Sequence, residues 1–137
     1  MPTITTPRPP LNLFNVGRIQ VPSFWTPILD VPDFFIPVNG PNPARTVTAV
    51  ALLTSLIVAN NSEDTLQFSA RIVDENGFGW LILNQMDIPP NDFALIDLGK
   101  QNMPSGERLE LKCENFQGAI ASLSYVLNQR EEYTVLA

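Results

Sequence analysis

The side chains that could carry acid–base or metal chemistry are five carboxylates in the middle of the chain. They are Asp74, Glu75, Asp87, Asp92 and Asp97. Carboxylates that converge can bind Ca²⁺ or act as a general acid and base, but none of the spacings matches an EF-hand loop. Four of the five lie in or beside expected turns, where Asp and Asn cap the backbone. We therefore favour a turn-capping or solvated role, with a calcium site or an acid–base pair as the alternative.

The chain has no histidine and only one cysteine, Cys113. Without histidine, the chain lacks the commonest general base and the commonest metal ligand of proteins. A nucleophilic Cys113 would lack a base, so we expect this side chain to be buried as a packing residue. The stretch ENGFGW (75–80) lacks the lysine of a phosphate-binding loop and the third glycine of a dinucleotide fingerprint. We therefore expect no enzyme activity, no cofactor and no metal.

Two further motifs have both a structural and a functional interpretation. Asn60-Asn61-Ser62 matches the glycosylation sequon, but the first residues, MPTITTPRPP, show no secretion signal, so we interpret it as a turn. Trp80 is most simply a core or inter-sheet residue. A carbohydrate platform at Trp80 would need further aromatic side chains on the same exposed face, and the sequence indicates none.

Composition indicates one folded domain, and because MPTITTPRPP shows no signal pattern we expect it to be made in the cytoplasm. The chain has 137 residues, 45% of them hydrophobic and 16% charged, which is too apolar for a disordered protein. No apolar run approaches the roughly 18 residues that a membrane span requires. The net charge of −6 argues against binding to nucleic acid phosphates.

Residues 44–137 have the pattern of an all-β domain. Apolar and polar residues alternate in three segments, which predicts strands with one inward face. Turn signals such as DENG (74–77) separate the predicted strands. We expect a single antiparallel β-sandwich or jelly-roll-like body of about six to eight strands, with a tight hairpin at Asn76-Gly77. The inward residues are Leu66, Phe68, Ala70 and Ile72; Leu109, Leu111 and Cys113; and Ala119, Ala121, Leu123, Tyr125 and Leu127.

Residues 46–60, TVTAVALLTSLIVAN, are apolar on both faces of an extended strand. In a regular strand, Val50, Leu52, Leu56 and Val58 would share one face, and Ala49, Ala51, Leu53 and Ile57 the other. Such a strand is either covered on both sides or consists of two strands joined by a bulge. Both alternatives remain open from the sequence.

Residues 1–43 have a different composition and predict an extended arm. They hold ten of the thirteen prolines, and VPSFWTPILDVPDFFIP (21–37) has a proline at every fifth position from Pro22 to Pro37. Proline at this density opposes helices and interior strands, while the aromatic content opposes disorder. We expect the arm to lie on its own body or, preferably, along a neighbouring chain. The expected anchors are Phe24, Trp25, Ile28, Leu29, Phe34 and Phe35.

The body resembles small β-sandwich structural proteins of tailed bacteriophages. Three stretches between residues 53 and 127 carry the resemblance: LTSLIVANNSEDTLQFSARIVDENG, ILNQMDIPPNDFALIDLGKQNMPSGERLELKCEN and GAIASLSYVL. The resemblance implies a virion location and a role as a capsid cement or decoration protein, or as a neck or tail component. A glycan-binding sandwich is the alternative from another class.

The resemblance also implies partners. They are the major capsid protein or other virion subunits, together with further copies of the chain in a dimer or trimer. Membranes and nucleic acids are not expected. If residues 1–43 are a separate arm, their deletion should leave a folded body that no longer attaches to particles.

Overall fold

A computed structural model of the chain describes residues 3–4, 11–31, 34–36, 45–114 and 119–134, and side chains within 16–31, 50–114 and 119–127. Every regular element in this part is a β-strand, and none of it forms a helix that could cross a membrane. The strands are β1 (Thr3–Ile4), β2 (Leu11–Gln20), β3 (Thr26–Asp30), β4 (Phe34–Ile36), β5 (Arg45–Asn60), β6 (Leu66–Val73), β7 (Gly79–Ile88), β8 (Asp92–Pro104), β9 (Arg108–Glu114) and β10 (Ala119–Thr134).

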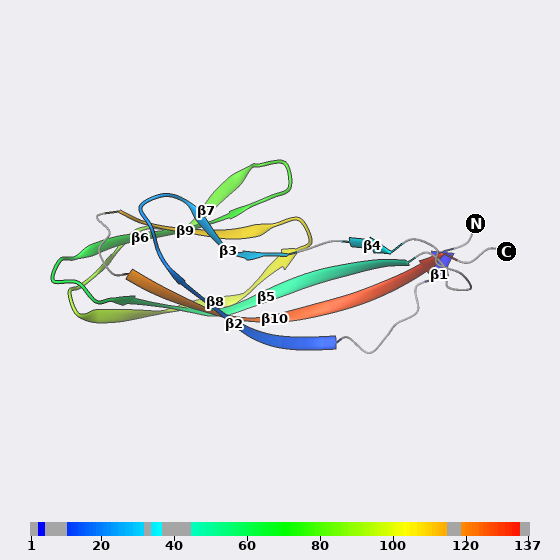
Figure 1. Cartoon of the computed structure of the whole chain (residues 1–137), viewed down its shortest axis with the longest axis horizontal. Helices are drawn as coiled ribbons and strands as arrows, with labels where there is room; N and C mark the ends of the chain where they lie inside the picture. Colours follow the sequence, from blue (N-terminus) through cyan, green and yellow to red (C-terminus); the bar gives the residue numbers. More distant parts are fainter. Residues whose placement is uncertain (1–2, 5–10, 32–33, 37–44, 115–118, 135–137) are drawn as a thin grey trace.

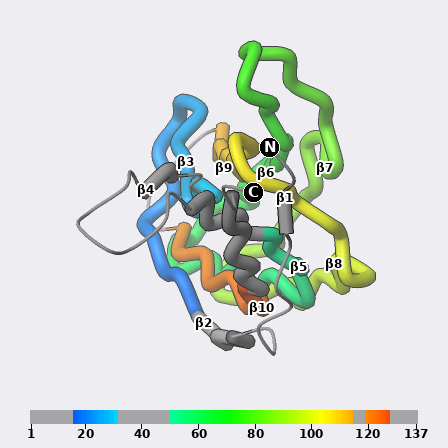
Figure 2. Tube along the Cα trace, turned by 90° about the vertical axis from the view of Figure 1, so that its right-hand side faces the viewer, coloured from blue at the N-terminus to red at the C-terminus, as the bar shows by residue number. Residues whose placement is uncertain are grey.

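Eight strands form two facing antiparallel sheets (Figure 1). One sheet has the order β2-β10-β5-β8 and the other β3-β9-β6-β7, and Figure 2 shows the two orders as two layers. Apart from the β6–β7 hairpin, successive strands of the sandwich alternate between the sheets as in the jelly roll, which is built from two Greek keys. The predicted all-β sandwich is confirmed, and its strand order is that of a jelly roll.

Strands β5 and β10 continue past the sandwich as a paired ribbon (Figure 1). Their register runs from Ala119 opposite Asn60 to Tyr133 opposite Arg45. Strand β4 pairs with the distal part of β5, and β1 pairs with the distal part of β10. The two shortest strands therefore flank the ribbon rather than the core.

The N-terminal segment is part of the sandwich, so the predicted separate arm is wrong for residues 11–30. Strand β2 pairs with β10 along its whole length, and β3 pairs with β9. Val21, Leu29 and Val31 are buried in the core. The predicted boundary near residue 43 lies outside the described residues.

Proline did not prevent this pairing because β3 is an edge strand. It has one neighbour, β9, and Pro27 lies beside a register shift in that pairing. Edge strands tolerate proline, since alternate N–H groups point away from the partner strand. Deleting residues 1–43 would therefore remove one edge strand from each sheet, so it does not isolate an arm from an intact body.

The core forms between the inner faces of the sheets, as the alternation predicted. Phe68, Ile72, Leu111 and Cys113 of one sheet and Leu123 of the other are fully buried. Tyr125 and Leu127 are partly buried against the same cluster. Burying each large apolar side chain contributes about 1.5–3 kcal/mol, so this cluster is the main stabilising feature of the sandwich.

Strand β5 contains the bulge that the sequence left as one of two alternatives. Its register against β8 shifts between Leu53 and Ser55, and Thr54 Oγ1 donates to the carbonyl oxygen of Ser124 at 2.8 Å. Before the shift, Ala51 and Leu53 are buried; after it, Leu56 and Val58 are buried. The prediction that Leu52 and Leu56 share a face is therefore wrong, because one extra residue reverses the phase of the strand.

The hairpin at residues 74–78 is confirmed, with a wider turn than predicted. Gly77 has a φ of +84°, whereas Asn76 is not in the left-handed region. Asp74 Oδ1 accepts the backbone N–H groups of Asn76 and Phe78, both at 2.9 Å. The turn thus depends on one glycine and one carboxylate cap, and it is longer than a two-residue Asn-Gly turn.

Asn60 joins two turns at one end of the sandwich. It is 1% exposed, and its Nδ2 donates to the carbonyl oxygens of Asp64, Ile88 and Pro89 at 2.7, 3.1 and 3.1 Å. Its Oδ1 accepts the N–H of Ser62 at 2.9 Å. The predicted turn at this sequon is confirmed, and the side-chain nitrogen that would carry a glycan is fully engaged.

Asn60→Asp should lower the free energy of unfolding by about 2–3 kcal/mol, because a carboxylate would face carbonyl oxygens that have lost their donor. Urea unfolding followed by circular dichroism measures this loss. Asn61→Asp is the matched control, since Asn61 is exposed and should tolerate the change. Equal losses for the two variants would contradict the role assigned to Asn60.

Candidate interaction surfaces

The outward side of the β2-β10-β5-β8 sheet carries a group of exposed apolar side chains beside the serines Ser55, Ser122 and Ser124. Within it, Leu95 lies opposite Ile57, and Ala59 lies between Phe93 and Ile120. We call this surface the outer apolar face. Its members are Val16, Ile57, Phe93, Leu95 and Ile120, which are 57%, 41%, 64%, 67% and 37% exposed.

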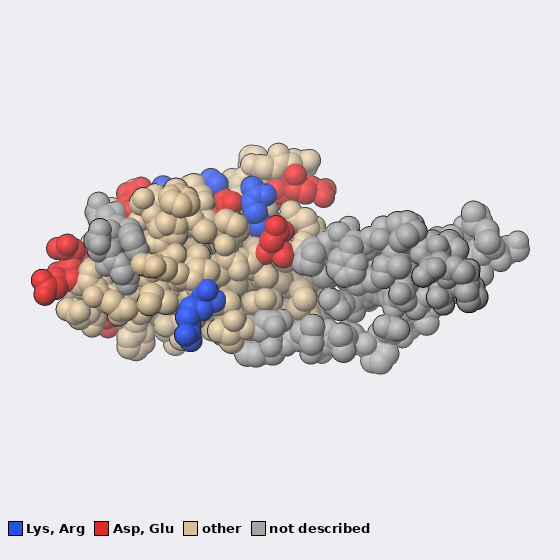
Figure 3. Space-filling view, viewed as in Figure 1, with Lys and Arg blue, Asp and Glu red and all other residues tan. Residues whose placement is uncertain are grey.

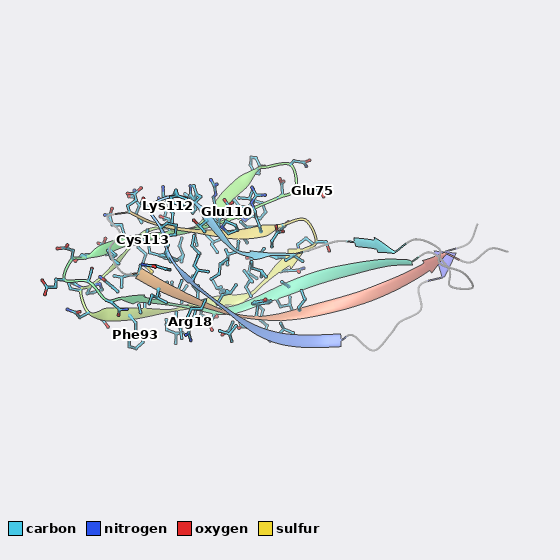
Figure 4. The ribbon with its side chains drawn as sticks, in the orientation of Figure 1. Arg18, Glu75, Phe93, Glu110, Lys112 and Cys113 are labelled. Atoms are coloured by element: carbon cyan, nitrogen blue, oxygen red, sulfur yellow. The ribbon has the colours of Figure 1, made fainter. Side chains whose placement is uncertain are left out.

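Opposite charges flank the outer apolar face. Arg18 on β2 lies in the same cross-strand row as Ser122, Ile57 and Leu95. Asp97 on β8 lies in the next row, and both side chains are exposed. Figure 4 shows Arg18 and Phe93 pointing away from the sandwich on the same side. An apolar face with charged edges is typical of a surface that contacts another protein.

The sequence signal for this face was the two-sided apolar pattern of residues 46–60. Ile57 is the residue that the bulge leaves outside, and FALIDL (93–98) places Phe93 and Leu95 out of phase with buried Ile96. The prediction concentrated on the N-terminal segment and did not assign this face. The sequence shows that residues 46–60 are apolar on both faces, but the position of the bulge decides which of these side chains are buried.

A second exposed apolar group lies at the β6–β7 hairpin. Phe78, Trp80 and Leu81 are 69%, 38% and 51% exposed, and β7 is an edge strand. Trp80 was predicted as a core or inter-sheet residue, and the core assignment is wrong: Trp80 lies at the open margin of the sheet, opposite fully buried Ile72. Phe78 also supplies a second exposed aromatic residue close to Trp80, which the sequence did not indicate.

The outward side of the β3-β9-β6-β7 sheet is charged. Figure 3 shows charged side chains mostly on this layer and at the ends of the sandwich. Glu110 accepts hydrogen bonds from Arg71 Nε at 2.7 Å and from Arg108 Nε at 2.9 Å. Trp25 lies over this network, with its ring centroid 4.3 Å from Arg71 Cζ and 4.9 Å from Lys112 Nζ. Cation–π contacts therefore attach Trp25 to its own sandwich.

The predicted anchors have different positions in the structure. Leu29 is a core residue at 9% exposure, and Ile28 is partly buried against the core, so both pack within their own chain. Phe24 is 67% exposed and remains available for a partner. Phe34 and Phe35 pair with Val47 and Thr46 through β4, and their side chains lie outside the described residues.

Two of the five candidate carboxylates, Asp74 and Asp97, cap a turn and a bulge. Asp74 caps the hairpin, and Asp97 Oδ1 accepts the N–H of Gly99 at 2.8 Å beside the bulge in β8. Asp92 Oδ1 accepts the N–H of Phe93 at 2.8 Å, while Asp87 is exposed. Within the part of the chain that the structure describes, no three His, Cys, Asp or Glu side chains form a group that could hold a metal ion.

Cys113 lies on the inward side of β9 and is fully buried, as predicted. Burial raises the pKa of its thiol to about 11, and the charge of Glu114 adds to the increase. A thiol with this pKa is almost entirely protonated at neutral pH, so it is a poor nucleophile.

Glu107 and Glu110, on either side of Arg108, have opposite electrostatic environments. Burial and the nearby charge of Asp74 raise the pKa of Glu107, and its buried Oε1 has no hydrogen-bond partner among the described residues. Burial would also raise the pKa of Glu110, but hydrogen bonds from Arg108 and Arg71 and their positive charges outweigh it and lower that pKa. Ionised Glu107 therefore destabilises the fold, and ionised Glu110 stabilises it.

Comparisons with known proteins identify no family. No protein-family model and no curated protein matches the chain. Among solved structures, a chain of infectious bursal disease virus Gx strain aligns with a TM-score of 0.41 and 11% identity, over 95% of this chain and 38% of that one. For the Gt strain the TM-score is 0.38, with 10% identity over 98% of this chain and 37% of that one.

The crystal structure of the infectious bursal disease virus VP2 subviral particle aligns with a TM-score of 0.35 and 13% identity, over 98% of this chain and 37% of that one. The chain thus spans less than two fifths of the length of these proteins. Because these similarities are weak, the assignment as a jelly-roll sandwich rests on the strand order of the chain itself.

Glu107→Gln and Glu110→Gln should change stability in opposite directions at pH 7. Glu107→Gln should stabilise the protein, and this gain should disappear below pH 4.5, the ordinary value at which the unfolded glutamate protonates. Glu110→Gln should cost about 2 kcal/mol, because it weakens two charged hydrogen bonds. The stabilisation from Glu110 is complete above pH 4.5 and is lost as the pH falls through its lowered folded pKa.

Denaturant unfolding between acid and neutral pH measures both effects, with the unsubstituted chain as the reference. A stability loss for Glu107→Gln at pH 7 would contradict the assigned environment of Glu107. A pH-independent cost for Glu110→Gln would contradict the assignment of Glu110 as an ionised hydrogen-bond acceptor.

Proposed function

We propose that the chain is a structural protein of a virion, and specifically a capsid cement or decoration protein. The outer apolar face is the observation that carries this proposal, because exposed apolar residues that adjoin one another, as Ile57, Leu95 and Phe93 do, mark sites of protein interaction. The eight-strand jelly-roll order supports it, since viral capsid domains commonly use this architecture. Lectin domains use it too, so the exposed surfaces and not the fold must decide between functions.

The proposed mechanism is attachment to other virion subunits through several surfaces. Exposed apolar side chains occur at three separate places: the outer apolar face, the β6–β7 hairpin and the loop at Phe24. A subunit that contacts neighbours at several places gains avidity, because each contact makes the next one effectively intramolecular. In this proposal the major capsid protein is the partner, and the chain performs no chemical step and uses no cofactor.

A neck or tail position is the alternative within the same class. The same surfaces would then contact ring subunits, and the distal ribbon of β5 and β10 would reach toward a neighbour. Particle reconstruction distinguishes the two positions, because cement subunits repeat over the whole shell while neck or tail subunits occupy one vertex.

Added to particles that lack it, the recombinant full-length chain should cosediment with them and raise the temperature at which they release their genome. Leu81→Ser should weaken cosedimentation several-fold, since it removes exposed apolar area from the hairpin. Asn84→Ser on the same strand is the matched control, because Asn84 is exposed and polar. Failure of the unsubstituted chain to cosediment with any particle component would contradict the virion role.

Glycan binding is a second candidate, favoured by exposed Phe78 and Trp80 at the hairpin. Aromatic faces bind sugar rings through apolar contact, so an adjacent pair could form a platform. Under this candidate, Trp80→Ala should abolish binding on a glycan array, and Phe24→Ala, which removes an exposed aromatic residue elsewhere, should not. An array on which the unsubstituted chain binds no glycan would exclude it for the sugars presented.

A further inference from the structure

We propose that a second copy of the chain covers the outer apolar face, with the two sheets packed face to face around a two-fold axis parallel to the strands. Such a contact is isologous, so the face must be complementary to itself. This inference goes beyond the proposed virion role and does not depend on it, since the dimer would exist in solution.

The strand order makes the centre of this face complementary to itself. A two-fold axis parallel to the strands, midway between β10 and β5, places β10 of one copy over β5 of the other. Ser122 and Ile57 share one cross-strand row, and Ile120 and Ala59 share the next. Each isoleucine of one copy therefore faces a serine or an alanine of the other, so large side chains meet small ones.

The charges at the edges select the same axis. The rotation places β2 of one copy over β8 of the other, which brings Arg18 close to Asp97 at both ends of the dimer. Leu95 lies in the same cross-strand row as Arg18, and Asp97 lies two residues further along β8. The two rows are about 7 Å apart, a distance that an arginine side chain spans. A two-fold axis perpendicular to the strands would instead place β2 over β2 and β8 over β8, so Arg18 would not lie over the strand that carries Asp97.

The outward side of the sheet that carries this face approaches the size of a standard contact. Its four strands are about 4.8 Å apart, and the described side chains of β5 from Val50 to Asn60 extend over roughly 35 Å, so this side of the sheet measures roughly 650 Å² in projection, and the outer apolar face is its part from Ser55 to Asn60. A standard protein interface buries about 800 Å² per partner. Sheets that pack face to face lie about 10 Å apart and cross at about 30°, so the central rows near the axis stay in register.

Sedimentation equilibrium of the full-length chain tests the proposal. The chain should form a dimer, and Ile57→Lys should raise the dimer dissociation constant at least about 100-fold, because a lysine would be buried against the serine of the other copy. Leu81→Lys is the matched control: Leu81 is also an exposed apolar strand residue but lies outside the face, and its substitution should leave the constant unchanged. Circular dichroism confirms that each variant is folded.

Two neutral substitutions test the axis. Arg18→Gln and Asp97→Asn should each weaken the dimer about two- to fivefold at low salt, and the double variant should be no weaker than either single one. Asparagine retains the Oδ1 that accepts the N–H of Gly99, so the bulge in β8 is preserved.

Three outcomes would overturn the proposal. They are a chain that stays monomeric up to about 1 mM, equal effects of Ile57→Lys and Leu81→Lys, and effects of Arg18→Gln and Asp97→Asn that multiply in the double variant. A monomeric chain that still cosediments with particles would refute the dimer and leave the virion role intact.

Discussion

The register shift at Thr54 decides which side of the central strand β5 faces the core. Side chains of a strand alternate between its two faces, so one extra residue reverses every position that follows. Leu53 and Leu56 can both be buried only because of this shift. Strand β8 accommodates it at Gly99 and Lys100, which have φ values of +61° and +60°. The core and the outer apolar face both depend on this one irregularity.

The two outward surfaces of the sandwich differ as a consequence. On the β3-β9-β6-β7 sheet, Arg71 and Glu110 form a charged network under Trp25, and this side of the molecule is covered by its own polar groups. On the other sheet the bulge leaves Ile57 outside, beside Leu95. Burying this exposed apolar area against another protein would lower the free energy, so this surface favours assembly.

Local patterns predicted most of the individual strands. The alternation in residues 66–72, 109–113 and 119–127 assigned the inward side chains correctly, and the Asn76-Gly77 signal predicted the hairpin, although only Gly77 has a positive φ. The same reasoning failed for the N-terminal segment, because a rule for interior strands was applied to strands at sheet edges. The partners of β2 and β3 are β10 and β9, far away in the chain, and no local pattern identifies them.

The sequence by itself determined the strand class, the positions of the turns and the inward residues of regular strands, because these depend on a period of two and on single glycine, proline and aspartate residues. Only the tertiary structure decided that Leu29 belongs to the core, that Trp25 lies on the charged sheet and that Ile57 faces outward. Those positions depend on pairing between distant segments and on the placement of one bulge, and both are set by the free energy of the whole sandwich.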